Sequence, residues 1–248
     1  MTSTPLTAPP GNAALTASRL TKSYGASVAL AGVDFRVDPG ESVAIMGASG
    51  SGKTTLLHCL AGIVAPDSGS VVLRSGQDAL EVTSLDEAGR SRLRREAFGF
   101  VFQQGLLLPE LTAVENVALP LMLTGTDRRP AEQTAAMWLA ALGLTGFEER
   151  RIGQLSGGQA QRVAIARAQV TGAAVVFADE PTGALDSQTS TEVMDALIRS
   201  TTDRGRSLVV VTHDESVASR CSRVLRLADG RIVGDRVSDD RILDGTSR

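Results

Sequence analysis

Eight consecutive residues of the chain have the types and the spacing that bind phosphate. Residues 47–54 read Gly-Ala-Ser-Gly-Ser-Gly-Lys-Thr and match the pattern G-x-x-x-x-G-K-[ST]. The apolar run Val43–Met46 before them is typical of a buried parallel strand, and the apolar segment after them is typical of a helix. Glycines let successive backbone N–H groups point at an anion, and the helix N-terminus adds partial positive charge. We therefore expect a nucleotide site formed by Gly47, Ala48, Ser49, Gly50, Ser51, Gly52, Lys53, Thr54 and Thr55.

Two side chains of this loop and two carboxylates further along could carry the chemistry. Lys53 is expected to reach the β- and γ-phosphates, and the Thr54 hydroxyl is expected to bind Mg²⁺. Asp179 and Glu180 follow the apolar run 175–178. There, Asp179 could hold Mg²⁺ or its water shell, and Glu180 could orient and deprotonate an attacking water. A solvated strand end is the alternative, but the apolar residues before the pair and the proline after it favour a pair that faces a cleft.

Composition and charge limit the classes of function. The chain has 248 residues, a net charge of −3, 42% hydrophobic residues and 3% aromatic residues. A weakly negative chain with few aromatic side chains offers neither a basic field nor a stacking platform, so no nucleic-acid partner is expected. Cys59 and Cys221 lack metal-ligand spacing and are interpreted as reduced thiols. No apolar run approaches the roughly 20 residues of a membrane span, and no signal segment is evident, so another chain would have to supply any span.

The order of the expected elements predicts an α/β fold. Strands alternate with helices, which is typical of a mostly parallel sheet with ligand sites at the carboxyl ends of its strands. The helix-rich stretch at about 105–170 interrupts this alternation and is interpreted as an α-helical subdomain inserted into the sheet domain. The early strands, at 17–24, 28–37 and 69–74, are expected to form an antiparallel β flank. The side chains that follow strand ends are Lys53, Asp179, Glu180 and His213, whereas His58 is interpreted as structural.

Local signals predict where individual helices and turns lie. Ser84-Leu85-Asp86-Glu87 has the pattern of a capping box and is expected to open a helix through Arg95. The four arginines at 90–95 could form a polyanion site, although the acidic residues at the start of the helix favour a solvated face. Residues 106–120 are apolar and punctuated by prolines. Further helices are expected over 131–142, from 155–159 to about 170 and over 191–200, and a hairpin is expected around 224–233.

A second glycine motif points to one family. Leu155-Ser156-Gly157-Gly158-Gln159 stands at the start of an expected helix and could bind another phosphate, which makes sense if that nucleotide is held by a second chain. The chain resembles the ATP-binding cassette family over about residues 17–235. The motifs that carry this resemblance, in the order of the family, are Tyr24, the phosphate loop, Gln103, the motif at 155–159, the strand with its carboxylates at 175–180, Ala184-Leu185-Asp186, and His213.

The resemblance implies a role for each motif on a P-loop NTPase (RecA-like) core that uses ATP and Mg²⁺. Tyr24 would stack on adenine, and Gln103 would sense the γ-phosphate, the metal and the water site while linking them to the helical subdomain. His213 would contact the γ-phosphate and help to align Glu180. Ser156 and Gly158 would contact the γ-phosphate on the opposite protomer, and Asp186 would lie at the dimer seam. Gly157 and Gln159 would also belong to the ATP site.

The resemblance also implies boundaries and partners. A disordered lead at 1–15, a nucleotide-binding domain at 16–240 with its helical subdomain at about 105–170, and a tail at 241–248 are expected. The nucleotide-binding domains would form a homodimer on ATP binding and would serve one or more integral-membrane permease subunits. The chain would then be a peripheral protein at the cytoplasmic face of the cell membrane.

Several segments resemble one branch of the family more narrowly. Phe100–Gln103, Leu107–Pro109, Leu111–Val117 and Glu180–Gly183 are similar to the lipoprotein-release and macrolide-export ATPases (MacB/LolD type), with the cell-division ATPase FtsE close to that group. The chain departs from the pattern at Ala160, Gln169 and Ala184, none of which is expected to touch the phosphates. This branch implies an ATPase subunit that powers export or lipid and lipoprotein extraction.

Other functions remain open at this point. An importer subunit is the nearest alternative, and an ATPase of cell-division or signalling type, in which nothing is transported, is a second. Ribosome-acting relatives usually carry two cassettes and DNA-repair relatives a long coiled coil, and neither fits into 248 residues. A module that binds nucleotide without hydrolysis is disfavoured because every catalytic position is filled.

Overall fold

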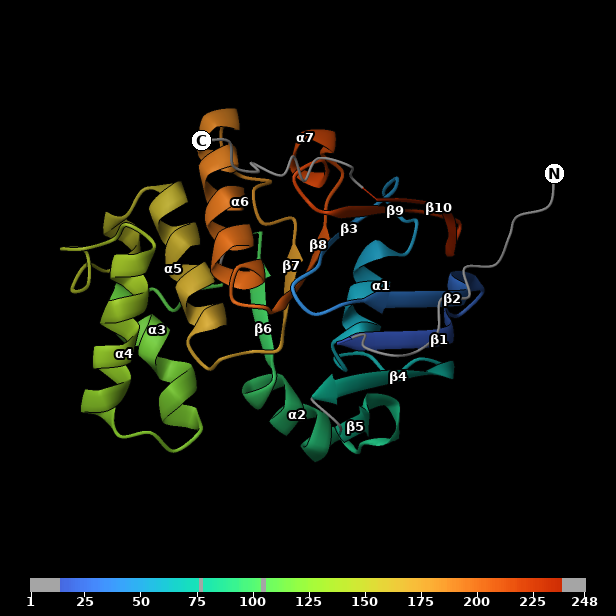
Figure 1. Ribbon diagram of the computed structural model, residues 1–248, viewed down its shortest axis with the longest axis horizontal. Helices are drawn as coiled ribbons and strands as arrows, with labels where there is room; N and C mark the ends of the chain where they lie inside the picture. Colours follow the sequence, from blue (N-terminus) through green and yellow to red (C-terminus); the bar gives the residue numbers. More distant parts are fainter. Residues whose placement is uncertain (1–13, 76–77, 104–105, 238–248) are drawn as a thin grey trace, which may run out of the picture.

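A six-stranded, mostly parallel sheet forms the centre of the molecule. The computed structural model describes residues 14–75, 78–103 and 106–237. The strand order is β10-β9-β3-β8-β7-β6 (Figure 1). Neighbours from β9 to β6 pair in parallel, and β10 pairs with β9 as an antiparallel hairpin. The strands are β3 (Ser42–Met46), β6 (Phe98–Phe102), β7 (Val175–Asp179), β8 (Ser207–Val211), β9 (Arg223–Ala228) and β10 (Arg231–Val237).

An antiparallel sheet flanks this centre, as expected from the early strands. Its order is β2-β1-β4-β5, and every neighbouring pair in it is antiparallel. The strands are β1 (Leu15–Tyr24), β2 (Ser27–Val37), β4 (Ser68–Ser75) and β5 (Asp78–Glu81). Leu15 opens β1 and is fully buried, although the expected boundary placed it in the lead segment. The expected lead over 1–13 and the expected tail at 241–248 lie outside the described residues.

Alternate residues of the central strands face two different cores, because side chains of a strand point to opposite faces in turn. One core lies under the helices that follow β6, and the other lies under α1 (Lys53–Leu60) and the antiparallel sheet. The first receives Ala44, Met46, Val176, Ala178, Leu208 and Val210. The second receives Val43, Ile45, Val175, Phe177, Val209 and Val211. Burial on both faces explains why these strands have continuous apolar sequences.

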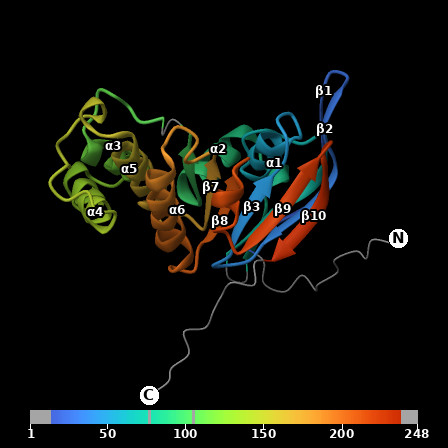
Figure 2. The ribbon, with the colours of Figure 1, turned by 90° about the horizontal axis from the view of Figure 1, so that it is seen from above.

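Three helices form a lobe at one end of the molecule, which agrees with the helical subdomain expected from the sequence. They are α3 (Ala113–Leu123), α4 (Arg128–Ala141) and α5 (Gly157–Gln169), with a short 3-10 helix, η2 (Ile152–Gln154), before α5. Figure 2 shows this lobe at the end opposite the hairpin of β1 and β2. Helix α6 (Ser187–Thr202) packs beside α5 and is longer at both ends than the expected 191–200. Helix α7 (Glu215–Ala218) follows β8.

Helix α3 lies in the proline-punctuated stretch where no separate helix was assigned. Thr112 accepts a hydrogen bond from the backbone N–H of Glu115, whose carboxylate accepts one from the backbone of Thr112. This capping box satisfies two of the unpaired donors at the helix start. Pro120 lies inside α3, three residues before its end, and cannot donate a backbone hydrogen bond to the carbonyl of Asn116.

The start of α2 (Glu87–Glu96) corrects the expected capping box. Asp86, not Ser84, is the N-cap, because its carboxylate accepts a hydrogen bond of 2.7 Å from the backbone N–H of Gly89. Ser84 belongs to the preceding 3-10 helix, η1 (Val82–Ser84), and its hydroxyl donates to the carbonyl of Glu81. Two of the arginines of α2, Arg90 and Arg94, pair with Glu87 on the same helix, which supports the solvated face over a polyanion site.

No helix in the described part of the chain is both long and apolar enough to span a bilayer.

Candidate functional site: a phosphate loop facing Glu180 and His213

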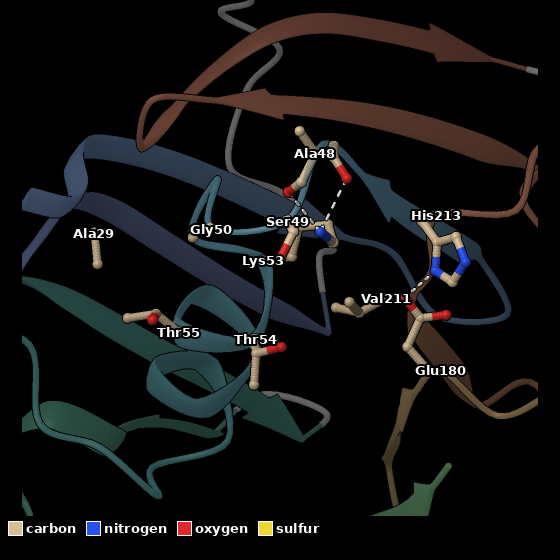
Figure 3. A pocket seen from close by; sticks show the side chains of 12 residues that line it. Ala29, Ala48, Ser49, Gly50, Lys53, Thr54, Thr55, Glu180, Val211 and His213 are labelled. Atoms are coloured by element: carbon tan, nitrogen blue, oxygen red, sulfur yellow. Dashed lines mark hydrogen bonds and ion pairs between the residues drawn. The ribbon is translucent and has the colours of Figure 1, made fainter. Parts of the chain in front are cut away.

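The phosphate loop and two side chains from other strand ends line one pocket of about 610 Å³ (Figure 3). Lys53 and Thr54, at the start of α1, lie on one side of this pocket, and Glu180 lies opposite beside His213. The four side chains meet because β3, β7 and β8 are parallel neighbours, so their carboxyl ends reach the same edge of the sheet. The lining is Ala29, Gly47, Ala48, Ser49, Gly50, Gly52, Lys53, Thr54, Thr55, Glu180, Val211 and His213.

The loop has its shape because two of its glycines tolerate no side chain. A Cβ at Gly47 would overlap the carbonyl oxygen of Leu227, and one at Gly52 would overlap the carbonyl oxygen of Ala29. Gly52 is also the N-cap of α1 with φ of 103°, a conformation that side chains disfavour. The backbone can therefore curl closely enough for its N–H groups to surround an anion.

Two polar groups of the loop fit phosphate oxygens. The ammonium of Lys53 donates hydrogen bonds of 2.9 Å to the carbonyl oxygens of Gly47 and Ala48, which holds its charge inside the curve of the loop. The hydroxyl of Ser51 is buried without a hydrogen-bond partner among the described residues. Because an unpaired buried hydroxyl is costly, the loop fits a ligand that is rich in acceptor oxygens.

Thr54 and Asp179 form the candidate metal position. The Thr54 hydroxyl lies near enough to the Asp179 carboxyl to lower its pKa, so two oxygen donors lie next to the loop. Burial nevertheless raises the pKa of Asp179, the charge of Glu180 adds to the rise, and the neighbouring His58 and Lys53 partly offset it. Within the described chain, no three His, Cys, Asp or Glu residues are grouped to hold an ion. Mg²⁺ commonly takes one or two protein oxygens together with phosphates and waters, so this donor pair fits it.

Glu180 and His213 contact each other directly. One carboxylate oxygen of Glu180 lies 2.8 Å from Nδ1 of His213, and the hydroxyl of Thr212 donates to the other oxygen at 3.4 Å. The hydrogen bond with Glu180, followed by its negative charge, raises the pKa of the largely exposed His213 imidazole. The backbone of Glu180 has φ of 47°, a region that non-glycine residues rarely occupy, and its N–H donates to the carbonyl of Val211.

Gln103 and Tyr24, like Ser51 and Asp179, lie outside the lining of this pocket. Gln103 directly follows β6, and its side chain is exposed. Its Nε2 would lie 2.8 Å from a Cβ at Gly183, so the Gln103 side chain lies along the turn after Glu180. Tyr24 ends β1 with 53% of its surface exposed, and the ammonium of Lys22 lies 5.6 Å from its ring centroid. The open face of Tyr24 suits the stacking role that the resemblance implies, and this role remains a prediction.

The second glycine motif is placed apart from the phosphate loop. Its residues at 156–159 contribute nothing to the lining of the pocket that holds Lys53. Ser156 caps α5 by accepting from the N–H of Gln159, and a Cβ at Gly158 would overlap a methyl group of Thr189 on α6. Asp186 is the N-cap of α6, and hydrogen bonds from Thr189 lower the pKa of its carboxyl. One chain therefore does not bring the two phosphate motifs to one nucleotide.

Sequence reasoning did not identify three neighbours of the site. Ala29 and Val211 line the pocket, and His58 lies near enough to favour the ionised form of Asp179. The apolar pair carries no chemical signal in the sequence. His58 could have been found, because it stands four residues after Thr54 and so lies on the same face of α1.

Strand, glycine loop and helix, with an acid pair at the end of a parallel strand two positions away in the sheet, define the class of P-loop nucleoside triphosphatases. The model of the ABC transporter family matches residues 30–183, and the chain belongs to this family. It binds ATP and hydrolyses it to ADP and phosphate.

Curated relatives place the chain near two kinds of cassette. The lipoprotein-releasing system ATP-binding protein LolD of Syntrophotalea carbinolica is 44% identical over 228 residues, which cover 90% of this chain and 99% of that protein. The macrolide export ATP-binding/permease protein MacB of Burkholderia thailandensis is 46% identical over 225 residues, which cover 89% of this chain. The chain spans about a third of the length of that relative (34%), so it corresponds to one portion of MacB.

Solved structures agree on the fold. A dimeric post-hydrolysis state of the ATP-binding cassette MJ0796, bound to ADP and Pi, is 37% identical with a TM-score of 0.81. The match covers 90% of this chain and 98% of that one. The fold is therefore that of an ABC ATPase, with a parallel core, an antiparallel β subdomain and a helical insertion, as the sequence predicted.

Proposed function

We propose that this chain powers export, or the extraction of lipids or lipoproteins, through a separate integral-membrane permease. The observation that carries the proposal is the likeness to LolD, which extends over nearly the whole length of both chains. The likeness to MacB at 46% identity supports the same direction of transport. Such a subunit would act at the cytoplasmic face of the cell membrane. Its nucleotide-binding domain would begin at Leu15, where β1 opens, rather than at 16, and would extend to about 240, with the helical subdomain at about 105–170.

The contacts in the pocket support a distinct role for each residue in ATP hydrolysis. Lys53 would bind the β- and γ-phosphate oxygens, and Glu180 would accept the proton of the attacking water at its carboxylate. His213 would orient that carboxylate through the bond between Nδ1 and Oε1. Thr54 and Asp179, with Gln103, would hold Mg²⁺, which neutralises charge on the phosphates when it is bound.

The separation of the two phosphate motifs supports a site shared by two chains. Lys53 of one protomer would bind the phosphates from one side, and Ser156 and Gly158 of the partner would close over the γ-phosphate from the other. The N-terminus of the long helix α5 and its backbone N–H groups suit that contact. ATP would then bind the paired state better than the separate chains and shift the equilibrium towards pairing.

The proposed permease contact lies on the lobe, where several large apolar side chains are exposed. They are Leu106 and Leu108, which precede α3, and Met122 and Leu123, which end it. Leu107 and Leu121, in the same two segments, pack partly against the core and are unsuited to this contact. Exposed apolar side chains next to the segment that follows Gln103 suit a protein interface.

Co-purification from detergent-solubilised membranes tests this proposal. The double variant Leu108→Glu/Leu123→Glu changes residues that are 43% and 63% exposed, so the fold should survive. Burying two carboxylates in an apolar contact should lower recovery of the membrane partner roughly tenfold or more. The matched control Val233→Glu changes an exposed apolar residue on β10, far from the lobe, and should recover the partner like the wild type. Equal recovery by all three proteins, or no membrane protein with the wild type, would contradict the proposal.

A further inference from the structure

The segment that carries Gln103 is attached to helix α5 just before that residue. Gln161, on α5, donates a hydrogen bond of 3.0 Å from its Nε2 to the carbonyl oxygen of Phe102. Gln161 is only 4% exposed, so its amide would be costly to leave unpaired. The backbone that sets the direction of the Gln103 side chain is therefore fixed by a buried side chain of another element.

The same helix is attached again just after Gln103. Arg167, six residues after Gln161 on α5, donates a hydrogen bond of 2.8 Å from Nη1 to the carbonyl oxygen of Leu106. Leu106 has φ of 46°, a conformation that a leucine adopts only when its surroundings hold it. Both bonds reach backbone carbonyls, so they fix the path of the chain whatever its side chains are.

Helix α3 fixes the next part of the segment. The side chain of the fully buried Asn116 accepts from the N–H of Leu108 at 2.8 Å and donates to its carbonyl at 3.0 Å. It also donates to the carbonyl of Thr112 at 3.0 Å. Three polar side chains from two helices thus hold the backbone on both sides of Gln103.

We infer that Gln161 and Arg167 are positioning residues, which make Gln103 move with the helix that begins at Ser156. The inference rests on the proposed function, in which Ser156 touches the γ-phosphate of one nucleotide and Gln103 serves the other site. Helix α5 joins the two, because its N-terminus carries Ser156 and its side carries both donors. Closure of α5 on the partner's nucleotide would thereby place Gln103 against the nucleotide of its own chain. Conversely, a displacement of Leu106 or Leu108 would move Ser156 through α5.

A double-mutant cycle in steady-state ATPase turnover tests this inference. Arg167→Met should lower kcat roughly fivefold, the factor that one net hydrogen bond gives, and leave KM for ATP unchanged. Arg167→Lys should recover part of the loss because it can still donate. Gln103→Ala should lower kcat by itself, and Gln103→Ala/Arg167→Met should be no slower than Gln103→Ala alone, because Arg167 acts through Gln103.

Arg162, on the same helix α5 as Arg167, provides a matched control. Its side chain faces α6 and forms an ion pair with Glu192 there, so Arg162→Met should leave kcat at the wild-type value. Full multiplication of the two losses in the double variant, or an unchanged kcat in Arg167→Met, would overturn the inference. If Arg167→Met does not fold, Gln161→Met enters the same cycle with the same outcomes. Lys53→Ala distinguishes failure of this inference from failure of the proposed function. If Lys53→Ala keeps its ATPase turnover, hydrolysis at the phosphate loop is refuted whatever the role of α5.

Discussion

The contact between Glu180 and His213 shows how single residues set up the chemistry of the pocket. Nδ1 of His213 lies 2.8 Å from the Glu180 carboxylate, and the backbone of Glu180 has a positive φ. Both the side-chain contact and the backbone conformation therefore fix the position of Glu180. If Glu180 acts as the proposed base, a carboxylate fixed in this way would meet an attacking water without having to reorient.

The charge of Glu180 makes a prediction about the titration of His213. Because the hydrogen bond and the carboxylate favour the imidazolium, the pKa of His213 should lie above its ordinary value. The pair then stabilises the fold fully below the ordinary pKa of histidine, and this stabilisation is lost as pH rises through the raised pKa. NMR of the imidazole protons measures the shift in the nucleotide-free chain, which has only two histidines. Glu180→Gln should lower this pKa, and an unchanged titration in that variant would contradict the pairing.

Residues that are contiguous in the sequence were the easiest to predict. Lys53 and Thr54 stand within one motif whose geometry follows from its letters, and the structure places both in the pocket. The closeness of His58 to Asp179 depends on how α1 packs against β7, which no local pattern states. Likewise, only packing shows that Leu107 and Leu121 turn inward while Leu106 and Leu108 stay exposed.

At the scale of elements, α3 and α5 hold the parts of the lobe together. Asn116 takes part in four hydrogen bonds to the backbone of residues 108–112, so the segment is structured although it has no regular secondary structure. Buried polar networks of this kind are favourable only when each member keeps its partner.

This network predicts a large loss of stability when Asn116 is changed. Asn116→Leu should lower the free energy of unfolding by about 2–4 kcal/mol, because it removes the side-chain partner of the Leu108 N–H and of the Leu111 carbonyl, while the carbonyls of Leu108 and Thr112 keep their backbone hydrogen bonds. Urea unfolding followed by circular dichroism measures the change. Thr134→Ala is a suitable control, since its hydroxyl donates at an exposed position to Pro130 and its loss should cost no more than about 0.5 kcal/mol. Equal stabilities of Asn116→Leu and the control would refute the supporting role of Asn116.

Helix ends were harder to predict than helix existence. The capping-box pattern at Thr112–Glu115 and the one expected at Ser84–Glu87 are similar in sequence, yet of these two only the first forms. At the second site Asp86 competes as a cap, because its carboxylate reaches the N–H of Gly89. Helix α6 begins earlier than its apolar stripe suggested, since Asp186 caps it before the first buried residue.

At the scale of the whole molecule, the two faces of the central sheet carry different tasks. One face packs α1 and the antiparallel sheet, which build the nucleotide pocket, and the other packs the helices that lead to the lobe. The alternation of strands and helices was enough to predict this layout, because parallel sheets need helical crossovers. That pattern does not predict how two chains pair, and the structure bears on it only because the residues at 156–159 do not line the pocket that holds Lys53.

The state of association therefore tests the central claim most directly. Glu180→Gln keeps the shape of the side chain, removes the proton acceptor and one negative charge, and should trap ATP between two chains. Size-exclusion chromatography of Glu180→Gln should give a dimer with Mg-ATP and a monomer without nucleotide, while adding Ser156→Arg should return the protein to a monomer in both conditions. A Glu180→Gln protein that stays monomeric at saturating Mg-ATP, or a dimer that survives Ser156→Arg, would contradict the two-chain site.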